Sequence, residues 1–134
     1  MARIVFDTSV LVSLTNGEPS ATEVAEWLNK VADGEVGGLV SAATIAELME
    51  KWCRSRSRSD ALNILESLKE SGIVVMDVTE EIAKLAGPLK TKFPQLSTAD
   101  AIIMSTAYVN NAKLYTFDKG FYGISGVEVM GLKE

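Results

Sequence analysis

Short apolar segments alternate along this chain with longer segments in which apolar residues recur every three or four positions. The short segments predict five strands, and residues 4–6 are apolar on both faces, as in a central strand of a parallel sheet. Strands that alternate with helices predict an α/β fold, in which a parallel sheet carries helices on both faces. The five predicted strands are residues 4–6, 39–40, 73–76, 113–116 and 127–130.

Five segments between these strands have helical periodicity. After Pro19, Ser20 and Glu23 have the spacing of a capping box that opens the first helix. In the fourth, Pro88 is expected to kink or end the helix and Pro94 to close it. The second carries one apolar stripe, formed by Ile45, Leu48, Met49, Trp52 and Cys53. The five predicted helices cover residues 20–32, a segment that includes the stripe at 45–53, residues from about 59 to 70, residues from 79 up to Pro94 at the latest, and residues 97–109.

The composition is that of one globular domain. The chain has 134 residues, of which 47% are hydrophobic and 23% charged, and no repeat or linker divides residues 1–134. Asp7 interrupts the apolar run near the N-terminus, and no uncharged stretch is long enough to cross a bilayer, so we expect a cytoplasmic protein without a signal peptide. The net charge of −5 argues against nucleic-acid binding by bulk positive charge, although a local basic patch is compatible with it.

The absence of one residue type excludes many kinds of site. The chain has no histidine, so a Ser-His-Asp triad, a Cys-His pair and every histidine-containing metal site are excluded. Cys53 is the one cysteine; it cannot form an internal disulfide, and we expect it to be a small buried residue on its helix. Any catalysis must therefore use carboxylates, hydroxyls, lysine or arginine.

Two acidic residues follow predicted strands closely. Asp7 comes directly after the first strand, and Asp118 lies just beyond the fourth. In parallel sheets, binding sites form beyond the carboxyl ends of the strands. Each residue also has a purely structural interpretation, since Asp7 can be the N-cap of a helix and Asp118, before Lys119 and Gly120, can be a turn residue.

Asp100 lies on a predicted helix, on the same face as Ile103, Met104 and Ala107. A carboxylate in such an apolar setting is costly unless another group compensates it. Asp100 is also three residues after Ser97, which is the spacing of a capping box. The sequence leaves both interpretations open.

Glu47 lies opposite the apolar stripe of its helix, where a solvated glutamate is expected. It could pair with Lys51 four residues later, or complete a capping box from Thr44. Phe121 and Tyr122 lie close to Asp118 in the sequence and could stack on a base. We expect Phe121 to pack in the core instead, whereas the sequence does not decide between the two roles for Tyr122.

Acids that converge on one edge of a sheet raise each other's pKa unless a cation lies between them. This chain offers only oxygen ligands, which select a hard cation such as Mg²⁺ or Mn²⁺. Such a cation orients a phosphodiester, stabilises developing charge and generates hydroxide from water. Convergence of the acids would therefore point to phosphoryl chemistry.

Four segments in this order and spacing resemble the motifs of PIN-domain nucleases. The small size of the chain is similar to that of the VapC-type toxins of prokaryotic toxin–antitoxin pairs. No single motif is specific, but all four in this order and spacing are strong evidence, and the resemblance covers essentially the whole chain. They are residues 4–10 (IVFDTSV), 44–48 (TIAEL), 97–102 (STADAI) and 114–121 (LYTFDKGF).

The resemblance implies a three-layer fold with a five-stranded parallel sheet in the order 3-2-1-4-5. It implies RNA cleavage by water that Mg²⁺ or Mn²⁺ activates, with a homodimer and a VapB-type antitoxin as the usual partners. The implied catalytic acids are Asp7, Glu47, Asp100 and Asp118, of which Asp7, Asp100 and Asp118 would bind the metal; Thr116 would support them. Arg54, Arg56 and Arg58 form a basic run that could bind RNA phosphates or be a solvated helix end.

Other functions fit parts of the same pattern. A haloacid-dehalogenase-type phosphatase needs a second Asp two residues after Asp7, where this chain has Ser9. A phospho-receiver domain needs an Asp after the third strand and a Lys after the fifth, which Asp77 and Lys133 match only loosely. An RNA-processing PIN nuclease without an antitoxin, and a non-catalytic RNA- or protein-binding module of the same fold, are further alternatives.

Overall fold

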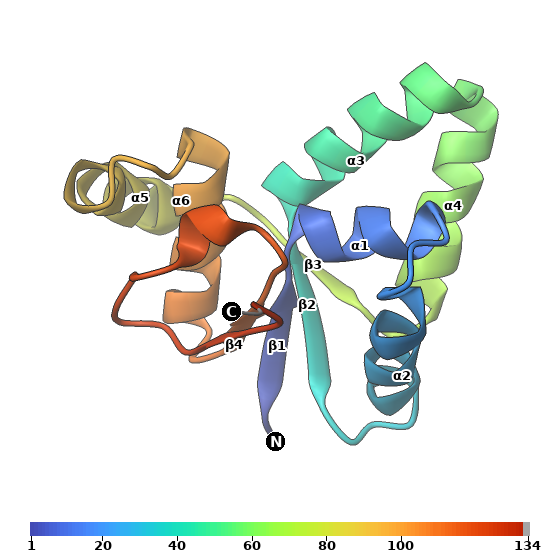
Figure 1. Ribbon diagram of the computed structural model, residues 1–134, viewed down its shortest axis with the longest axis horizontal. Helices are drawn as coiled ribbons and strands as arrows, with labels where there is room; N and C mark the ends of the chain where they lie inside the picture. The colour runs from blue at the N-terminus through green and yellow to red at the C-terminus, as the bar shows by residue number, and fades with distance from the viewer. Residues whose placement is uncertain (133–134) are drawn as a thin grey trace.

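Within residues 1–132, which the computed structural model describes, five strands form one parallel sheet (Figure 1). Their order is β3-β2-β1-β4-β5, so β1 lies at the centre of the sheet. The predicted strands and the order implied by the PIN-domain resemblance are therefore confirmed. The strands are β1 (Arg3–Phe6), β2 (Gly37–Ser41), β3 (Val74–Met76), β4 (Lys113–Tyr115) and β5 (Val129–Met130).

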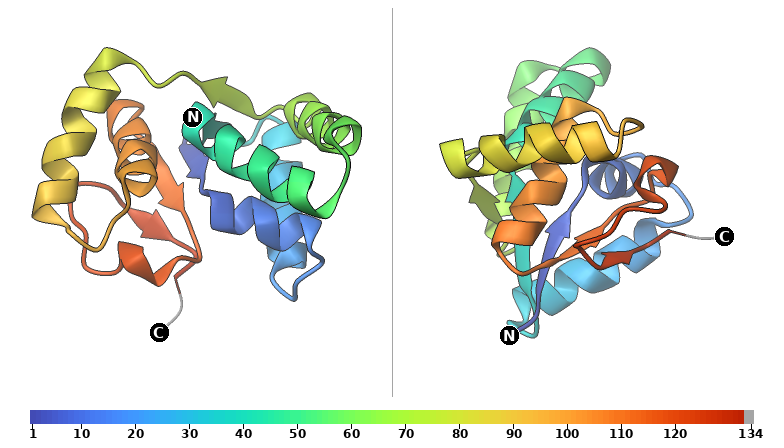
Figure 2. Two further views of the ribbon diagram at one scale, coloured as in Figure 1. Left: turned by 90° about the horizontal axis from the view of Figure 1, so that it is seen from above. Right: turned by 90° about the vertical axis from the view of Figure 1, so that its left-hand side faces the viewer.

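Helices cover both faces of this sheet, as the views from the side and from above show (Figures 1 and 2). In the described residues α1 to α4 pack on one face, while α5 and α6 pack on the other. The helices are α1 (Thr8–Thr15), α2 (Ala21–Ala32), α3 (Ala42–Ser55), α4 (Arg58–Glu70), α5 (Glu80–Lys92) and α6 (Thr98–Val109), and a 3-10 turn, η1, spans Lys119–Phe121.

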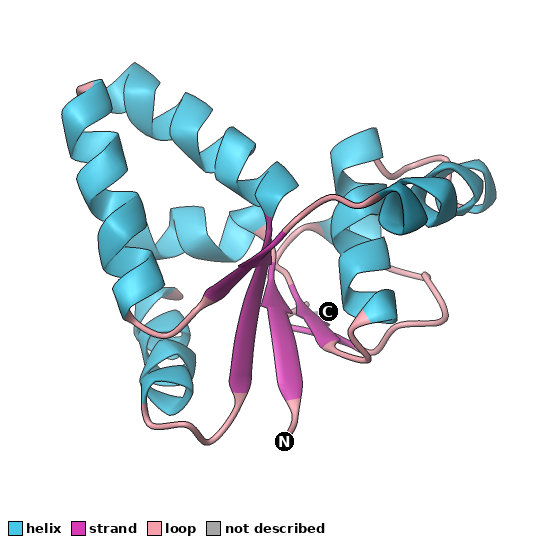
Figure 3. Ribbon diagram, turned by 180° about the vertical axis from the view of Figure 1, so that it is seen from behind, coloured by secondary structure: helices cyan, strands magenta, loops and turns pink. Residues whose placement is uncertain are grey.

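The alternation of side chains along the strands divides the core in two. Ile4 and Phe6 of β1 pack with Val40 of β2 on the side of α1 to α4, whereas Val5 and Leu39 pack on the side of α6. All five residues are buried. Both faces of the central strands are therefore covered, which explains why β1 is apolar at consecutive positions. The ribbon coloured by secondary structure shows the strands between the two groups of helices (Figure 3).

Two local predictions about helices are wrong. Ser20 makes no capping bond, because its backbone is already helical (φ −72°, ψ −9°) and not extended as a capping residue requires; its hydroxyl bonds that of Ser13 instead. Cys53 is exposed, although we expected it to be buried. It lies about 80° from Ile45 around the helix, at the edge of the stripe, and in the last turn of α3.

The arrangement of the sheet also bears on two alternatives. Receiver domains have the strand order 2-1-3-4-5, with the third strand at the centre. Here Asp77 follows β3, which is an edge strand, and Lys133 lies outside the described residues. Within residues 1–132, no helix has the length and the apolar content to span a membrane.

Candidate active site

The four acids predicted from the sequence line a single pocket of about 220 Å³ at the carboxyl edge of the sheet. They come from four separate segments: the junction of β1 and α1, the middle of α3, the first turn of α6, and the loop after β4. Only the fold brings these segments together. We call this hollow the acid pocket; its lining residues are Asp7, Thr8, Ser9, Val12, Glu47, Lys51, Asp100 and Asp118.

Asp7 lies at the base of the acid pocket, with only 3% of its surface exposed. Its Oδ2 atom accepts hydrogen bonds from Thr116 Oγ1 at 2.7 Å and from Ser9 Oγ at 2.8 Å. Asp7 occupies the N-cap position of α1, but its side chain makes no capping bond. Asp7 is therefore the N-cap residue, as the capping interpretation predicts, but its carboxylate accepts from two hydroxyls and does not cap the helix.

Burial raises the pKa of the Asp7 carboxyl above its usual value, because the ionised form loses its hydration. The hydrogen bonds from Thr116 and Ser9 favour the ionised form and oppose this effect, while the charge of Asp100 raises the pKa of Asp7 further. Burial is the largest of these contributions. A cation in the acid pocket would offset the cost, since it stabilises the ionised carboxylate.

The two hydroxyls that hold Asp7 also connect α1 to the segment after β4. Ser9 Oγ accepts from the Phe117 N–H at 3.1 Å, and Thr116 Oγ1 accepts from the Asp118 N–H at 3.0 Å. Thr116 is fully buried and lies beneath the pocket. Sequence reasoning did not identify Ser9 as part of this network. The spacing of Ser9 from Asp7 could have indicated this contact, because a hydroxyl two residues after an N-cap acid lies in the first turn of the same helix.

Glu47 is partly buried and lines the acid pocket. Thr8 Oγ1 donates to Glu47 Oε1 at 2.6 Å and lies 3.2 Å from Thr44 Oγ1. The solvated interpretation is wrong, because α1 packs against α3 and covers this face of the helix. No ion pair joins Glu47 to Lys51 in the described residues, and the N-cap of α3 is Ser41 rather than Thr44.

Asp100 and Asp118 have structural roles and also line the acid pocket. Asp100 Oδ2 accepts from the Ser97 N–H at 3.0 Å, and Ser97 Oγ accepts from the Asp100 N–H at 3.0 Å, which completes the capping box. Asp118 Oδ1 accepts from the Gly120 N–H at 2.8 Å within a turn. Each of these bonds uses one carboxylate oxygen, so the second oxygen stays available to a ligand.

The donor set of the acid pocket consists of oxygens, which suits a hard cation. Within residues 1–132, no three acidic side chains stand close enough together to form a metal-binding group. One oxygen of each of Glu47, Asp100 and Asp118 accepts a hydrogen bond from a partner in the protein. The oxygen donors of the acid pocket fit Mg²⁺ or Mn²⁺ chemically.

The basic run predicted as an RNA contact does not reach the acid pocket. Arg54 lies about 10 Å beyond Glu47 along the axis of α3. Its Nη2 atom lies 3.0 Å from Glu50 Oε1. Arg56 and Arg58 are exposed at the turn between α3 and α4. None of the three arginines lines the pocket, whereas Lys51 does.

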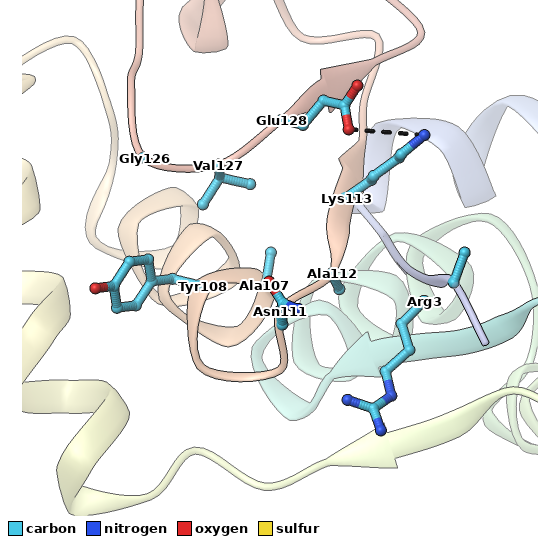
Figure 4. Close-up of a pocket in the computed structure, with 10 residues that line it drawn as sticks. Arg3, Ala107, Tyr108, Asn111, Ala112, Lys113, Gly126, Val127 and Glu128 are labelled. Carbon is cyan, nitrogen blue, oxygen red and sulfur yellow. Dashed lines mark ion pairs between the residues drawn. The ribbon is translucent and has the colours of Figure 1, made fainter.

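A slightly larger hollow of about 270 Å³ lies at the opposite edge of the sheet (Figure 4). Arg3 and Lys113 begin β1 and β4, so this hollow lies at the amino ends of the strands. Its cations already have partners: Arg3 donates to the Asn110 carbonyl at 3.1 Å, and Lys113 Nζ lies 3.6 Å from Glu128 Oε2. The chemistry that could act on a phosphodiester is therefore in the smaller acid pocket.

Comparison with protein families finds one family model that matches most of the chain. The family model for the PIN domain matches residues 4–127, a span that includes all four acids. The chain belongs to the PIN domain family. This decides against the phosphatase and receiver alternatives. No curated protein matches this PIN domain in sequence.

Solved structures with this fold include toxins and their complexes. A chain of a toxin–antitoxin complex from Klebsiella pneumoniae is 26% identical to this PIN domain, with a TM-score of 0.73, and the match covers 92% of this chain and 94% of that chain. VapBC2 from Rickettsia felis, bound to a DNA fragment from its promoter, is 22% identical with a TM-score of 0.74, over 95% and 96% of the two chains. VapC20 from Mycobacterium tuberculosis, a toxin that cleaves the sarcin–ricin loop, is 19% identical with a TM-score of 0.72, over 93% and 98%.

Proposed function

We propose that this PIN domain is an endoribonuclease that depends on Mg²⁺ or Mn²⁺. The observation that carries the proposal is the acid pocket, in which Asp7, Glu47, Asp100 and Asp118 meet from four segments of the chain. Four carboxylates without a histidine or a cysteine suit a hard cation, and membership of the PIN domain family supports nuclease chemistry. The similarity to VapC20, a toxin that cleaves an RNA loop, supports RNA as the substrate.

In this proposal Asp7, Asp100 and Asp118 hold the cation, which supplies Lewis-acid stabilisation of the phosphodiester and activation of water. The rest of the site positions these groups. Ser9 and Thr116 fix the Asp7 carboxylate from beneath, and the capping box with Ser97 fixes Asp100 at the start of α6.

Glu47 has a separate position in the same pocket, held by the hydroxyl of Thr8 at 2.6 Å. Its free oxygen is available to contact substrate or cation. Because Thr8 and Ser9 are consecutive residues of α1, the first turn of this helix fixes two acids, Glu47 and Asp7, at once. We expect that the site is assembled by hydroxyl groups whose own positions depend on the fold.

We infer that the nuclease is the toxin of a VapBC-type pair. The match to the Klebsiella pneumoniae toxin–antitoxin complex supports this, because it spans nearly the whole of both chains. A short antitoxin would then cover the acid pocket, and two copies of the nuclease would form a homodimer in the cytoplasm. Co-purification with the product of a small upstream reading frame, and light scattering of the free protein, test these partners. A monomer at all concentrations contradicts the dimer, and a genome without a candidate antitoxin next to this gene would move the role towards RNA processing.

The activity is tested with purified protein and a panel of end-labelled RNAs, each incubated with Mg²⁺, with Mn²⁺ and with EDTA. We expect cleavage in the presence of either cation, products that carry a 5′-phosphate, and no cleavage in EDTA. Restoration of activity when Mn²⁺ is added in excess of EDTA distinguishes a cation requirement from damage to the protein. Cleavage that is equally fast in EDTA contradicts the proposed mechanism.

A further inference from the structure

We propose that Lys51 binds a phosphate of the RNA strand next to the cleaved bond, and that the strand leaves the acid pocket between α1 and α3. This inference rests on the proposed function. A second hollow of about 200 Å³ lies between these two helices, and we call it the α1–α3 groove. Its lining residues are Val12, Thr15, Asn16, Lys51, Trp52 and Ser55.

The groove continues directly from the acid pocket. Val12 of α1 and Lys51 of α3 line both hollows, so the two share a wall on each helix. α1 and α3 contact each other in the fold and diverge from their N-terminal ends onward (Figure 1). A strand whose phosphodiester lies among the four acids and that continues into the groove must therefore pass the Lys51 ammonium.

Lys51 is the one cationic side chain among the residues that line either hollow. The other charged groups of the acid pocket are four carboxylates, which repel an RNA backbone, and the whole chain carries a net charge of −5. A single ammonium at the exit of the pocket is thus the local source of attraction for a phosphate.

The Lys51 ammonium has no ion pair in residues 1–132. The acid one turn earlier on the same helix, Glu47, forms no ion pair with it, and the adjacent Glu50 pairs with Arg54 at 3.0 Å. Lys51 is also exposed. Its charge is therefore available to a ligand rather than committed to the fold.

The groove itself has the polarity of a nucleic-acid backbone site. Asn16 contributes an amide, the hydroxyls of Thr15 and Ser55 donate to the backbone carbonyls of Val12 and Lys51, and no carboxylate lines the groove. Neutral side chains of this kind contact sugar and phosphate oxygens in nucleic-acid complexes. Trp52 Nε1 donates to Thr15 Oγ1 at 3.3 Å, which fixes the floor of the groove between the two helices.

The test is the affinity of a fluorescent single-stranded oligoribonucleotide, measured by anisotropy in Ca²⁺ at several NaCl concentrations, with a gel to verify that the strand is intact. Lys51→Gln should weaken binding about tenfold, as expected for the loss of one charge-assisted contact. It should also flatten the slope of log Kd against log[NaCl] by about 0.7, the contribution of one phosphate contact in a single strand. Lys51→Arg should stay close to wild type in both. Lys69→Gln on α4 makes the same change of charge away from both hollows, and should change neither quantity.

A second pair of variants tests the path of the strand. Ser55→Glu places a negative charge in the groove and should weaken binding, whereas Ser59→Glu, exposed at the start of α4, should not. Wild-type affinity and salt slope in Lys51→Gln, or equal losses in Lys51→Gln and Lys69→Gln, overturn the assignment of Lys51. Equal effects of the two glutamate variants overturn the path. If wild type cleaves RNA and Lys51→Gln binds it normally, only this inference fails; if wild type neither binds nor cleaves any RNA, the proposed function fails and this inference with it.

Discussion

The hydroxyl of Thr116 donates a hydrogen bond of 2.7 Å to Oδ2 of Asp7, a residue 109 positions earlier in the chain. The register of the sheet produces this contact. Phe6, the last residue of β1, pairs with Tyr115, the last residue of β4. Asp7 directly follows the first of these and Thr116 the second. Parallel strands point their carboxyl ends to the same edge, so the pairing of two buried strands sets the position of a buried carboxylate.

Thr116→Val removes this hydroxyl with little change in shape. We expect a loss of about 1–3 kcal/mol in the free energy of unfolding, because Asp7 loses a donor and the Asp118 N–H loses its acceptor. RNA cleavage should fall as well, since both acids lose a positioning bond. Urea unfolding in EDTA and the cleavage rate in Mn²⁺ measure the two effects. Thr116→Ser keeps the hydroxyl and should restore most of both; a valine variant as stable and active as wild type would refute this role.

The pKa of Asp7 predicts a dependence of stability on pH. Burial raises this pKa in the folded protein above the value of 3.8 expected in the unfolded chain. Upward from pH 3.8, the folded state therefore binds more protons at Asp7 than the unfolded state does, and the free energy of unfolding falls as the pH rises through the folded pKa. Asp7→Asn removes this contribution, and its neutral oxygen can still accept the bonds from Ser9 and Thr116.

We therefore expect Asp7→Asn to be more stable than wild type near neutral pH in EDTA, and the difference to shrink as the pH falls towards 3.8. Thermal melts of the two proteins from about pH 4 to 8 give this difference directly. A variant that is less stable than wild type at neutral pH, by an amount independent of pH, would show that the ionised carboxylate stabilises the metal-free fold.

Asp100 has a capping role and a proposed ligand role, which two substitutions separate. Ser97→Ala removes the hydroxyl that accepts from the Asp100 N–H and should cost about 1 kcal/mol, while the stabilisation by Mn²⁺ stays intact. Asp100→Asn should change the melt in EDTA only slightly, because it weakens a helix-dipole contact but relieves repulsion with Asp7. It should lose most of the Mn²⁺ stabilisation. A full Mn²⁺ shift in Asp100→Asn would show that this residue is a cap and not a ligand.

Cys53 gives a check on the surface of α3. Because it is exposed, iodoacetamide should modify it in the native protein at a rate similar to that in urea. Cys53→Ser should change the free energy of unfolding by less than about 0.5 kcal/mol, as for other exposed positions. Mass spectrometry at timed intervals follows the modification. Strong protection in the native state would contradict this placement and would indicate a partner or a second copy on this surface.

The sequence predicted the five strands because each is short and mainly apolar. Phe121 is buried as expected, and Tyr122 is exposed. Asp7 and Asp118 could be selected from their positions after strands and Asp100 from its capping box, which the structure confirms, whereas Glu47 was selected only by the family resemblance. Thr8 reaches Glu47, and Ser9 reaches Phe117, only after α1 packs against α3 and beside β4. Such contacts depend on the register of distant elements, whereas the local pattern around Glu47 indicates nothing but a solvated helix face.

The most direct test of the central claim compares one acid in the pocket with one outside it. The single-turnover rate of cleavage of one RNA, at one Mn²⁺ concentration that is just sufficient to saturate wild type, is measured for wild type, Asp7→Asn and Glu66→Gln. Glu66 is exposed on α4 and does not line the acid pocket. We expect the Asp7→Asn variant to cleave the RNA more than about a hundredfold more slowly than wild type, because the substitution weakens cation binding at the base of the acid pocket. The Glu66→Gln variant should cleave it at the wild-type rate. Equal rates for wild type and Asp7→Asn would contradict the assignment of the acid pocket as the active site.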